Sequence, residues 1–394
     1  MGRKQFLLLV LTLLILGGVG FGLFWQDLST YRASGAKIGA KLIPELKVAD
    51  VAQVELRNAK SRVTLVRKEN WWVVQERGGY PADFKAISDL IIKLSDLKVV
   101  QAETVGESLW ARVELVEPAQ GGGGGKGEGA GTQVELKDAA GKTLVNLILG
   151  KTILKKDPGN PLPSAQDGVP AGRYVRTVGA AERVVVVSDP LAQADASPGR
   201  WLDKTFMKAD RLKTLAVAGE GTSWKLTREA EWEPWKLVGG GEVDPNVAVR
   251  AANAIGQLAP TDVAGDKAEE AGSPIVVTAE TFDALAYTFR LAKRKGSDDY
   301  LLRVNVAGEP PRSRVPEKGE KPEERDKRDK EFAEGRQRLE ARLAREKAQS
   351  VWTYIVDAKQ VEPLLKPRAQ LIAVKAADQR GKAPAERPPA GRAK

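Results

Sequence analysis

The chain of 394 residues contains no cysteine and no histidine. Without cysteine it can form no disulfide bond, thiolate nucleophile, iron–sulfur cluster or cysteine-ligated zinc site. Without histidine it lacks the usual general base near neutral pH and the commonest metal ligand, which excludes every Ser-His-Asp and Cys-His catalytic centre. A cysteine-free chain also tolerates an oxidising compartment. These absences favour a protein that acts by shape and contact.

Long blocks of one charge sign are also missing. The chain has 62 basic and 52 acidic residues, a formal net charge of +10. Such a charge can attract nucleic acid, anionic lipid or an acidic protein surface. Because Lys and Arg alternate with Asp and Glu almost everywhere, the excess reads as solvated surface, and we expect no nucleic-acid partner.

Motifs that would carry chemistry are incomplete. Ser95 and Lys98 match S-x-x-K, but the companion S-D-N and K-T-G elements of that chemistry are absent from the sequence. The glycine-rich run 120–131 fails the phosphate-loop pattern at both ends, and Asp298-Asp299 lacks calcium-loop spacing. The sequence therefore predicts no catalytic, cofactor-binding or metal-binding residue and no enzyme activity. A hydrolase that uses carboxylates alone stays open as an alternative.

The amino terminus has the pattern of a membrane anchor. Arg3 and Lys4 precede the uncharged, mainly apolar run 6–25, and about 20 such residues are needed for a helix to cross a bilayer. Trp25 at its end is typical of an interfacial anchor. The run is longer than the apolar core of a cleaved signal peptide, which is the rival interpretation. We expect a cytoplasmic stub at 1–5, a transmembrane signal anchor at 6–25, a juxtamembrane linker at 26–48 and a body in the periplasm, attached to the inner membrane.

Two glycines in the anchor form a G-x-x-x-G pattern, Gly18 and Gly22. Such a pair can bring two membrane helices close together. It also arises by chance in a glycine-rich anchor. A homodimer through Gly18 and Gly22 is therefore one of two open interpretations.

The body contains one pattern written twice. The apolar positions of 51–56 recur 161 residues later in 212–217, and Trp71 recurs as Trp232. Alternating apolar residues predict half-buried strands, and the apolar positions of 87–97 recur every three or four residues, as in a helix that covers a sheet. We align Pro81 with Pro245 and place both at the first position of a helix, which accepts proline, with Asp244 as N-cap. Further expected strands in each copy are 133–136, 144–149, 174–178, 183–187, 275–278, 287–291, 301–306 and 351–356.

The repeated β-β-β-α unit predicts an α+β protein with two tandem, internally duplicated antiparallel-sheet lobes, each covered by a helix. The lobes are expected at 49–200 and 201–372, with helices near 83–97 and 246–258. The first carries the flexible glycine-rich loop 120–131. The second carries a charged helical insertion at 309–349, which is either a solvated projection or a partner-binding helix. Residues 373–394 read as a disordered basic tail.

Five tryptophans, Trp71, Trp72, Trp224, Trp232 and Trp235, occupy related positions in the two copies. They could stack on a sugar or a peptide. Their recurrence favours packing residues of a shared scaffold.

With these features in view, the chain resembles the bacterial family called domain of unknown function 4340 over about residues 49–370. The resemblance rests on the junction 201–204, the hairpin phrase 137–144, Leu149-Gly150-Lys151 and Gly172-Arg173-Tyr174-Val175. It implies an anchored envelope protein encoded beside ABC-type transporters of the gliding-motility kind, with no catalytic residues to carry over. The insertions 120–131 and 309–349 depart from the family pattern.

The sequence therefore predicts a non-enzymatic, membrane-anchored accessory or scaffold protein of the bacterial cell envelope, with ABC-type transporter subunits as candidate partners. The alternative is an extracytoplasmic binding module for an envelope glycan or peptide.

Overall fold

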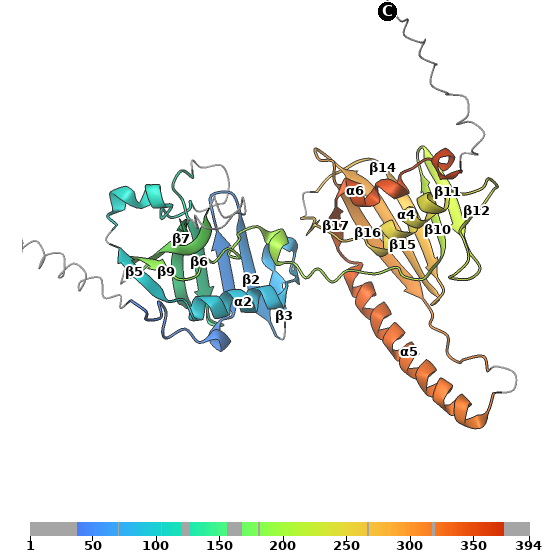
Figure 1. The fold of residues 1–394 in the computed structure, drawn as a ribbon, viewed down its shortest axis with the longest axis horizontal. Helices are drawn as coiled ribbons and strands as arrows, with labels where there is room; N and C mark the ends of the chain where they lie inside the picture. Colours follow the sequence, from blue (N-terminus) through green and yellow to red (C-terminus); the bar gives the residue numbers. More distant parts are fainter. Residues whose placement is uncertain are drawn as a thin grey trace, which may run out of the picture. The chain divides into compact units, whose positions relative to one another are not determined.

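The computed structural model describes residues 38–69, 71–103, 105–119, 127–155, 168–179, 182–265, 268–316 and 320–373. The chain divides into two compact units after Asp203, and Figure 1 shows a sheet in each. The expected anchor 6–25, Gly18 and Gly22, and the tail from residue 374 lie outside the described residues. Among the helices that the structure does describe, none is long and apolar enough to cross a membrane.

The first unit is built on a nine-stranded antiparallel sheet with the order β4-β3-β2-β1-β6-β7-β8-β9-β5. Its strands are β1 (Gln53–Arg57), β2 (Arg62–Lys68), β3 (Trp71–Val74), β4 (Tyr80–Pro81), β5 (Val99–Glu103), β6 (Thr132–Lys137), β7 (Thr143–Lys155), β8 (Val169–Thr177) and β9 (Arg183–Val187). Strand β1 is central because it pairs with both β2 and β6, with Val54 opposite Leu65 and Leu136.

One face of this sheet is covered by helix α2 (Phe84–Ser95) (Figure 1). The helix begins at Asp83, whose carboxylate accepts a hydrogen bond from the Ala86 amide at 3.0 Å. Its apolar stripe is buried and consists of Ile87, Leu90, Ile91 and Leu94. The alternating apolar side chains of β1 and β2 are fully buried as well, so this face forms the main core of the unit.

The opposite face carries a smaller core. Leu115, Ile148 and Val184 are buried there and pack with Trp110 and its neighbours. Trp110 comes from the 3₁₀ helix η3 (Glu107–Val113). The Arg176 guanidinium stacks on the Trp110 ring, 4.1 Å from its centroid, and its Nε donates to the Leu115 carbonyl at 3.1 Å.

The second unit has an eight-stranded antiparallel sheet with the order β12-β11-β10-β14-β15-β16-β17-β13. Its strands are β10 (Leu212–Gly219), β11 (Thr222–Thr227), β12 (Lys236–Leu237), β13 (Asp262–Val263), β14 (Glu270–Thr281), β15 (Leu285–Arg294), β16 (Tyr300–Gly308) and β17 (Thr353–Val356). Helix α4 (Pro245–Gly256) and the short α6 (Ala358–Val361) cover one face (Figure 1). On the other face Thr278, Thr288 and Asn305 are exposed, as in an antiparallel sheet with one wet side.

Apart from the edge strand β4, which has no counterpart in the second sheet, both sheets have the same succession of strands. From β1 the first sheet runs outward through β2 to β3 on one side and through β6, β7, β8, β9 and β5 on the other. From β10 the second sheet runs through β11 to β12 and through β14, β15, β16, β17 and β13. The expected mixed α+β architecture of antiparallel sheets with covering helices is confirmed.

The expected position of Pro81 is wrong. Pro81 lies in the short edge strand β4, and α2 begins only after Asp83. Pro245 does occupy the first turn of α4, after the N-cap Asp244. An edge strand accepts proline as readily as the first helical turn does, so the sequence alone did not distinguish the two. The two helices correspond when their N-cap residues, Asp83 and Asp244, are aligned. These caps are 161 residues apart, the same spacing as that of the repeated strands.

Each unit ends with a short segment that pairs beside the start of its helix. In the first unit Asp83 N–H donates to the Trp201 carbonyl at 2.8 Å, and Asp203 N–H donates to the Pro81 carbonyl at 2.9 Å. In the second, Asp244 N–H donates to Leu371 and Ala373 N–H to Glu242, both at 2.8 Å. The junction around Trp201 thus closes the first unit, three residues beyond the boundary expected from the sequence.

Candidate functional site

The largest difference between the two sheets is a helical arm in the second unit. In the first unit residues 178–182 connect β8 to β9, whereas in the second residues 309–352 connect β16 to β17. This long connection contains α5 (Pro322–Gln349), a helix of 28 residues. Figure 1 shows α5 leaving the sheet at one end and extending away from it. A segment added to one hairpin is not needed to complete the sheet.

The charges of α5 are unevenly distributed. Residues 322–334 contain six acidic and four basic side chains, whereas 335–349 contain five basic and two acidic ones. Acidic side chains near the amino end and basic ones near the carboxyl end interact favourably with the helix dipole and stabilise the helix. This arrangement also leaves the half near the sheet basic.

Along one face of α5, its inner face, residues partly or fully shielded from solvent recur alternately four and three residues apart. They are Arg328, Phe332, Gly335, Leu339, Arg342, Glu346 and Gln349. Only Leu343 and Glu346 are buried in the whole helix. The helix is therefore fixed to the unit through its last two turns, here called the root (residues 342–349).

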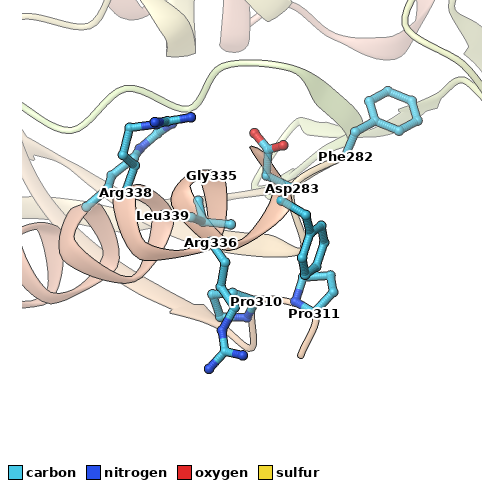
Figure 2. Close-up of a pocket in the computed structure, with 10 residues that line it drawn as sticks. Phe282, Asp283, Pro310, Pro311, Gly335, Arg336, Arg338 and Leu339 are labelled. Atoms are coloured by element: carbon cyan, nitrogen blue, oxygen red, sulfur yellow. The ribbon is translucent and has the colours of Figure 1, made fainter. Parts of the chain in front are cut away.

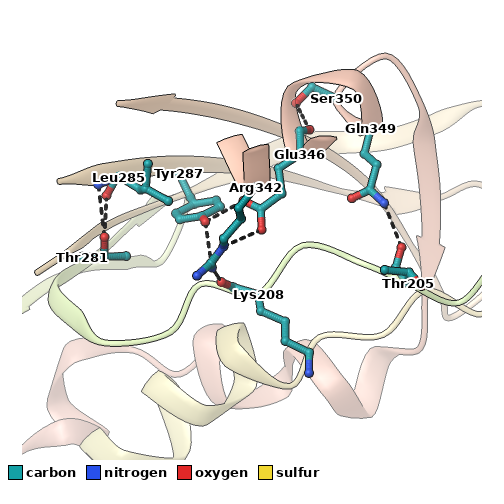
Figure 3. A network of polar contacts seen from close by, with 9 residues as sticks. All are labelled: Thr205, Lys208, Thr281, Leu285, Tyr287, Arg342, Glu346, Gln349 and Ser350. Carbon is teal, nitrogen blue, oxygen red and sulfur yellow. Dashed lines mark hydrogen bonds and ion pairs between the residues drawn. The ribbon is translucent and has the colours of Figure 1, made fainter. Parts of the chain in front are cut away.

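A polar network holds the root in place (Figure 3). The Tyr287 hydroxyl on β15 donates to Glu346 Oε2 at 2.7 Å, and Arg342 Nε donates to Glu346 Oε1 at 2.9 Å. Arg342 also donates to the Lys208 carbonyl, while Gln349 donates to the Thr205 carbonyl at 2.8 Å. The root thereby joins the sheet to the segment that opens the second unit.

Glu346 is only 1% exposed, so its carboxylate oxygens depend on two protein hydrogen-bond donors for the partners that water would otherwise supply. Burial raises the pKa of Tyr287, and its hydrogen bond to the Glu346 carboxylate adds to the rise. A tyrosine held protonated in this way is a donor and not a base. The network stabilises the attachment of α5 to the sheet.

A pocket of about 400 Å³ lies beside the root. Its apolar wall consists of Phe282, Pro310, Pro311, Phe332 and Leu339. Arg336, Arg338 and Arg342 of α5 also line it, as does Asp283 from the turn after β14. Figure 2 shows Arg336, Arg338 and Asp283 around it. Apolar walls beside arginines fit an apolar side chain flanked by carboxylates, because arginine forms two-pronged hydrogen bonds with carboxylate groups. Within α5 these arginines already pair with Glu340, Glu334 and Glu346.

The segment before α5 runs back along the helix. Arg336 donates to the Arg312 carbonyl at 3.2 Å. The Arg314 guanidinium forms paired hydrogen bonds with Glu320 at 2.8 Å and bonds with Asp329 at 2.9 and 2.8 Å. These contacts raise the pKa of Arg314 and lower that of Glu320. Beyond the root the arm is thus braced by its own leading segment.

Ser95 and Asp298, from two of the incomplete motifs, have ordinary structural contacts. Ser95 Oγ donates to the Ile92 carbonyl at 2.8 Å as part of the last helical turn. The Asp298 side chain is 98% exposed and forms an ion pair with Lys293 at 3.5 Å. Among the described residues no group of three acidic side chains is arranged to hold a metal ion.

The tryptophans divide into two classes. Trp72, Trp224 and Trp235 are buried, as expected for packing residues, but Trp71 is 60% and Trp232 is 87% exposed. Packing was therefore the wrong prediction for these two. The sequence did not reveal the difference, because exposure depends on which sheet face or turn receives the ring. The buried Tyr287–Glu346 pair was also missed, since Glu346 looks like any other charge on a highly charged helix.

No protein-family model, curated protein or solved structure matches this chain.

Proposed function

We propose that this protein is a non-enzymatic accessory or scaffold protein of the bacterial cell envelope. It is held at the inner membrane by the segment 6–25, with its body in the periplasm. It captures a membrane partner, such as an ABC-type transporter subunit, through the α5 arm and the pocket at its root.

The arm carries this proposal. It lies in the connection 309–352, whereas the corresponding connection of the first unit spans only residues 178–182. Only its root is buried, so most of its side chains are exposed to solvent and accessible to another surface. Its basic half and the arginines of the pocket favour a partner with carboxylates around an apolar side chain.

Two features of the sequence support the location. The run 6–25 has the length and lack of charge of an anchor. The resemblance to domain of unknown function 4340 implies an envelope protein associated with a transporter. An anchored protein needs only a weak contact, because confinement beside its partner raises the effective concentration.

We further infer that the two units arose by duplication of one unit. The shared strand order, the equal spacing of Asp83 and Asp244, and the corresponding closing segments support this inference. On this basis the sheet, helix and closing segment that the units share supply the fold, and the α5 arm gives the second unit a separate role in binding.

The test is photo-crosslinking in native membranes with the full chain. A photoreactive residue replaces Ala333 or Ala341, which are both exposed on α5. We expect specific captured proteins, identified by mass spectrometry, and retention of the chain in the membrane fraction after a carbonate wash.

The decisive variant carries Arg338→Glu, Arg345→Glu and Lys347→Glu, three exposed basic positions of α5. It should capture about tenfold less partner, because like charges then oppose the acidic surface. The matched control carries Glu323→Lys, Glu324→Lys and Asp326→Lys in the acidic half and should capture at least as much as the unaltered chain. Equal capture by both variants contradicts the proposed docking surface.

A further inference from the structure

The most exposed tryptophan lies on a braced turn. Trp232 is 87% exposed and belongs to the turn between β11 and β12. Arg228 Nη1 donates to the Glu231 carbonyl at 2.5 Å, and its guanidinium stacks on Trp235 at 4.6 Å. Lys236 forms ion pairs with Glu229 and Glu233 at 3.3 and 3.8 Å. A large apolar ring is therefore exposed to water on a turn that these contacts hold in place. Because the turn is already ordered, it loses little conformational entropy when a ligand binds.

The turn forms one wall of a groove of about 600 Å³. Apolar contact comes from Trp232, Trp235, Pro234, Pro245 and Val249. The charged side chains that line it are Arg228, Lys236, Glu233 and Glu242, two of each sign. Balanced charge does not select a strongly acidic or basic ligand, whereas aromatic-lined grooves of this kind recognise proline-rich segments.

The last described residues of the chain run along this groove. Ile372 pairs with Val243, and Ala373 N–H donates to the Glu242 carbonyl at 2.8 Å. Both Glu242 and Val243 line the groove. The remaining chain, 374–394, thus begins at the wall of the groove.

That remaining chain contains a proline-rich segment, residues 383–390, with the sequence Ala-Pro-Ala-Glu-Arg-Pro-Pro-Ala. The chain between Ala373 and residue 383 can span at most about 36 Å. A short tether gives an effective concentration of order millimolar. Proline loses little conformational freedom on binding, because its ring already fixes φ.

We propose that the Trp232 groove is a binding site for proline-rich peptide and that its occupant is the chain's own segment 383–390. The site is separate from the α5 arm.

The test places a photoreactive residue at Val249, a groove position that is 49% exposed, in the full chain. We expect intramolecular crosslinks to residues 383–390, mapped by mass spectrometry of the digested protein. Trp232→Ala, and separately the triple change Pro384→Ala, Pro388→Ala and Pro389→Ala, should each reduce them at least about threefold.

Matched controls come from the first unit. Trp71→Ala removes the corresponding exposed ring and should leave the crosslinks unchanged. A photoreactive residue at Ser88, the α2 position that corresponds to Val249, should not capture the segment. Because Trp232 is exposed, its loss does not unfold the unit, which an unchanged thermal midpoint verifies. Crosslinks that reach no residue of 383–390, that survive both sets of changes, or that reach a glycan or another protein instead would overturn the proposal.

Discussion

At the scale of single residues, the buried contact between Tyr287 and Glu346 is the most informative feature. A carboxylate with 1% exposure is stable only while its donors remain in place, and leaving such a group unpaired costs about 1–3 kcal/mol. The contact lies between strand β15 and helix α5. Stability of the second unit and attachment of the arm therefore depend on the same pair.

The tyrosine gives a pH dependence with a definite sign. The pKa of Tyr287 is raised above its ordinary value of 10.0, so above about pH 10 the unfolded chain loses this proton while the folded chain keeps it. The free energy of unfolding must therefore fall as pH rises from about 10 through the folded pKa, and the contribution is complete below pH 10. Tyr287→Phe should remove this part of the fall and cost about 1–3 kcal/mol at neutral pH.

Guanidinium unfolding of both proteins between about pH 8 and 11 measures the effect. Tyr300→Phe is the control, because it removes a tyrosine on β16 outside the network. An identical pH slope with and without Tyr287 contradicts the assignment.

At the scale of elements, the two covering helices begin in the same way. Asp83 accepts from the Ala86 amide at 3.0 Å, and Asp244 accepts from the Asn246 amide at 2.8 Å. Asp83→Ala and Asp244→Ala should each lower the free energy of unfolding of their own unit by about 0.5–2 kcal/mol. Asp89→Ala, which removes only an exposed ion pair with Lys85, should cost less than about 0.5 kcal/mol. Chemical unfolding curves decide. If Asp89→Ala lowered the free energy of unfolding as much as Asp83→Ala, the N-cap hydrogen bond would not explain the effect.

The arm and its root should respond differently to deletion. Pro311 and Gly335 line the same pocket, so a short Gly/Ser linker can replace residues 312–334 and leave the root intact. We expect an unchanged thermal midpoint for this variant. Replacing 312–349 also removes Leu343 and Glu346 and should destabilise the second unit by about 3–5 kcal/mol. Thermal unfolding of the two variants compares them directly. Equal midpoints would show that the root contributes nothing to stability.

At the scale of the whole molecule, the two units should unfold independently. Each has its own sheet, helix and closing segment. Trp201 is 1% exposed in the first unit, and Trp201→Ala should cost that unit about 3–5 kcal/mol without changing the second. Residues 38–203 and 204–373 produced separately should each unfold cooperatively. Calorimetry of the full chain with and without Trp201→Ala checks this, and a shift of both transitions would contradict it.

The sequence by itself determined the elements. The alternation around Val54 and Leu56, the stripe Ile87, Leu90, Ile91 and Leu94, and their recurrence in the second half specify half-buried strands and covering helices, because periodicity is a local property of the chain. The charge pattern likewise specified α5. The absence of cysteine and histidine removed most reaction classes before any contact was known.

Only the tertiary structure decided which residues meet. Pro81 suits an edge strand and a helix start equally, and its place was settled by pairing of Tyr80 and Pro81 with β3. Trp232 and Trp224 are the same residue type in neighbouring segments, yet one is on a turn and the other in the core. Glu346 became a buried anchor because β15 brings Tyr287 within 2.7 Å. Contacts between distant residues depend on how elements pack, and local pattern contains no record of that packing.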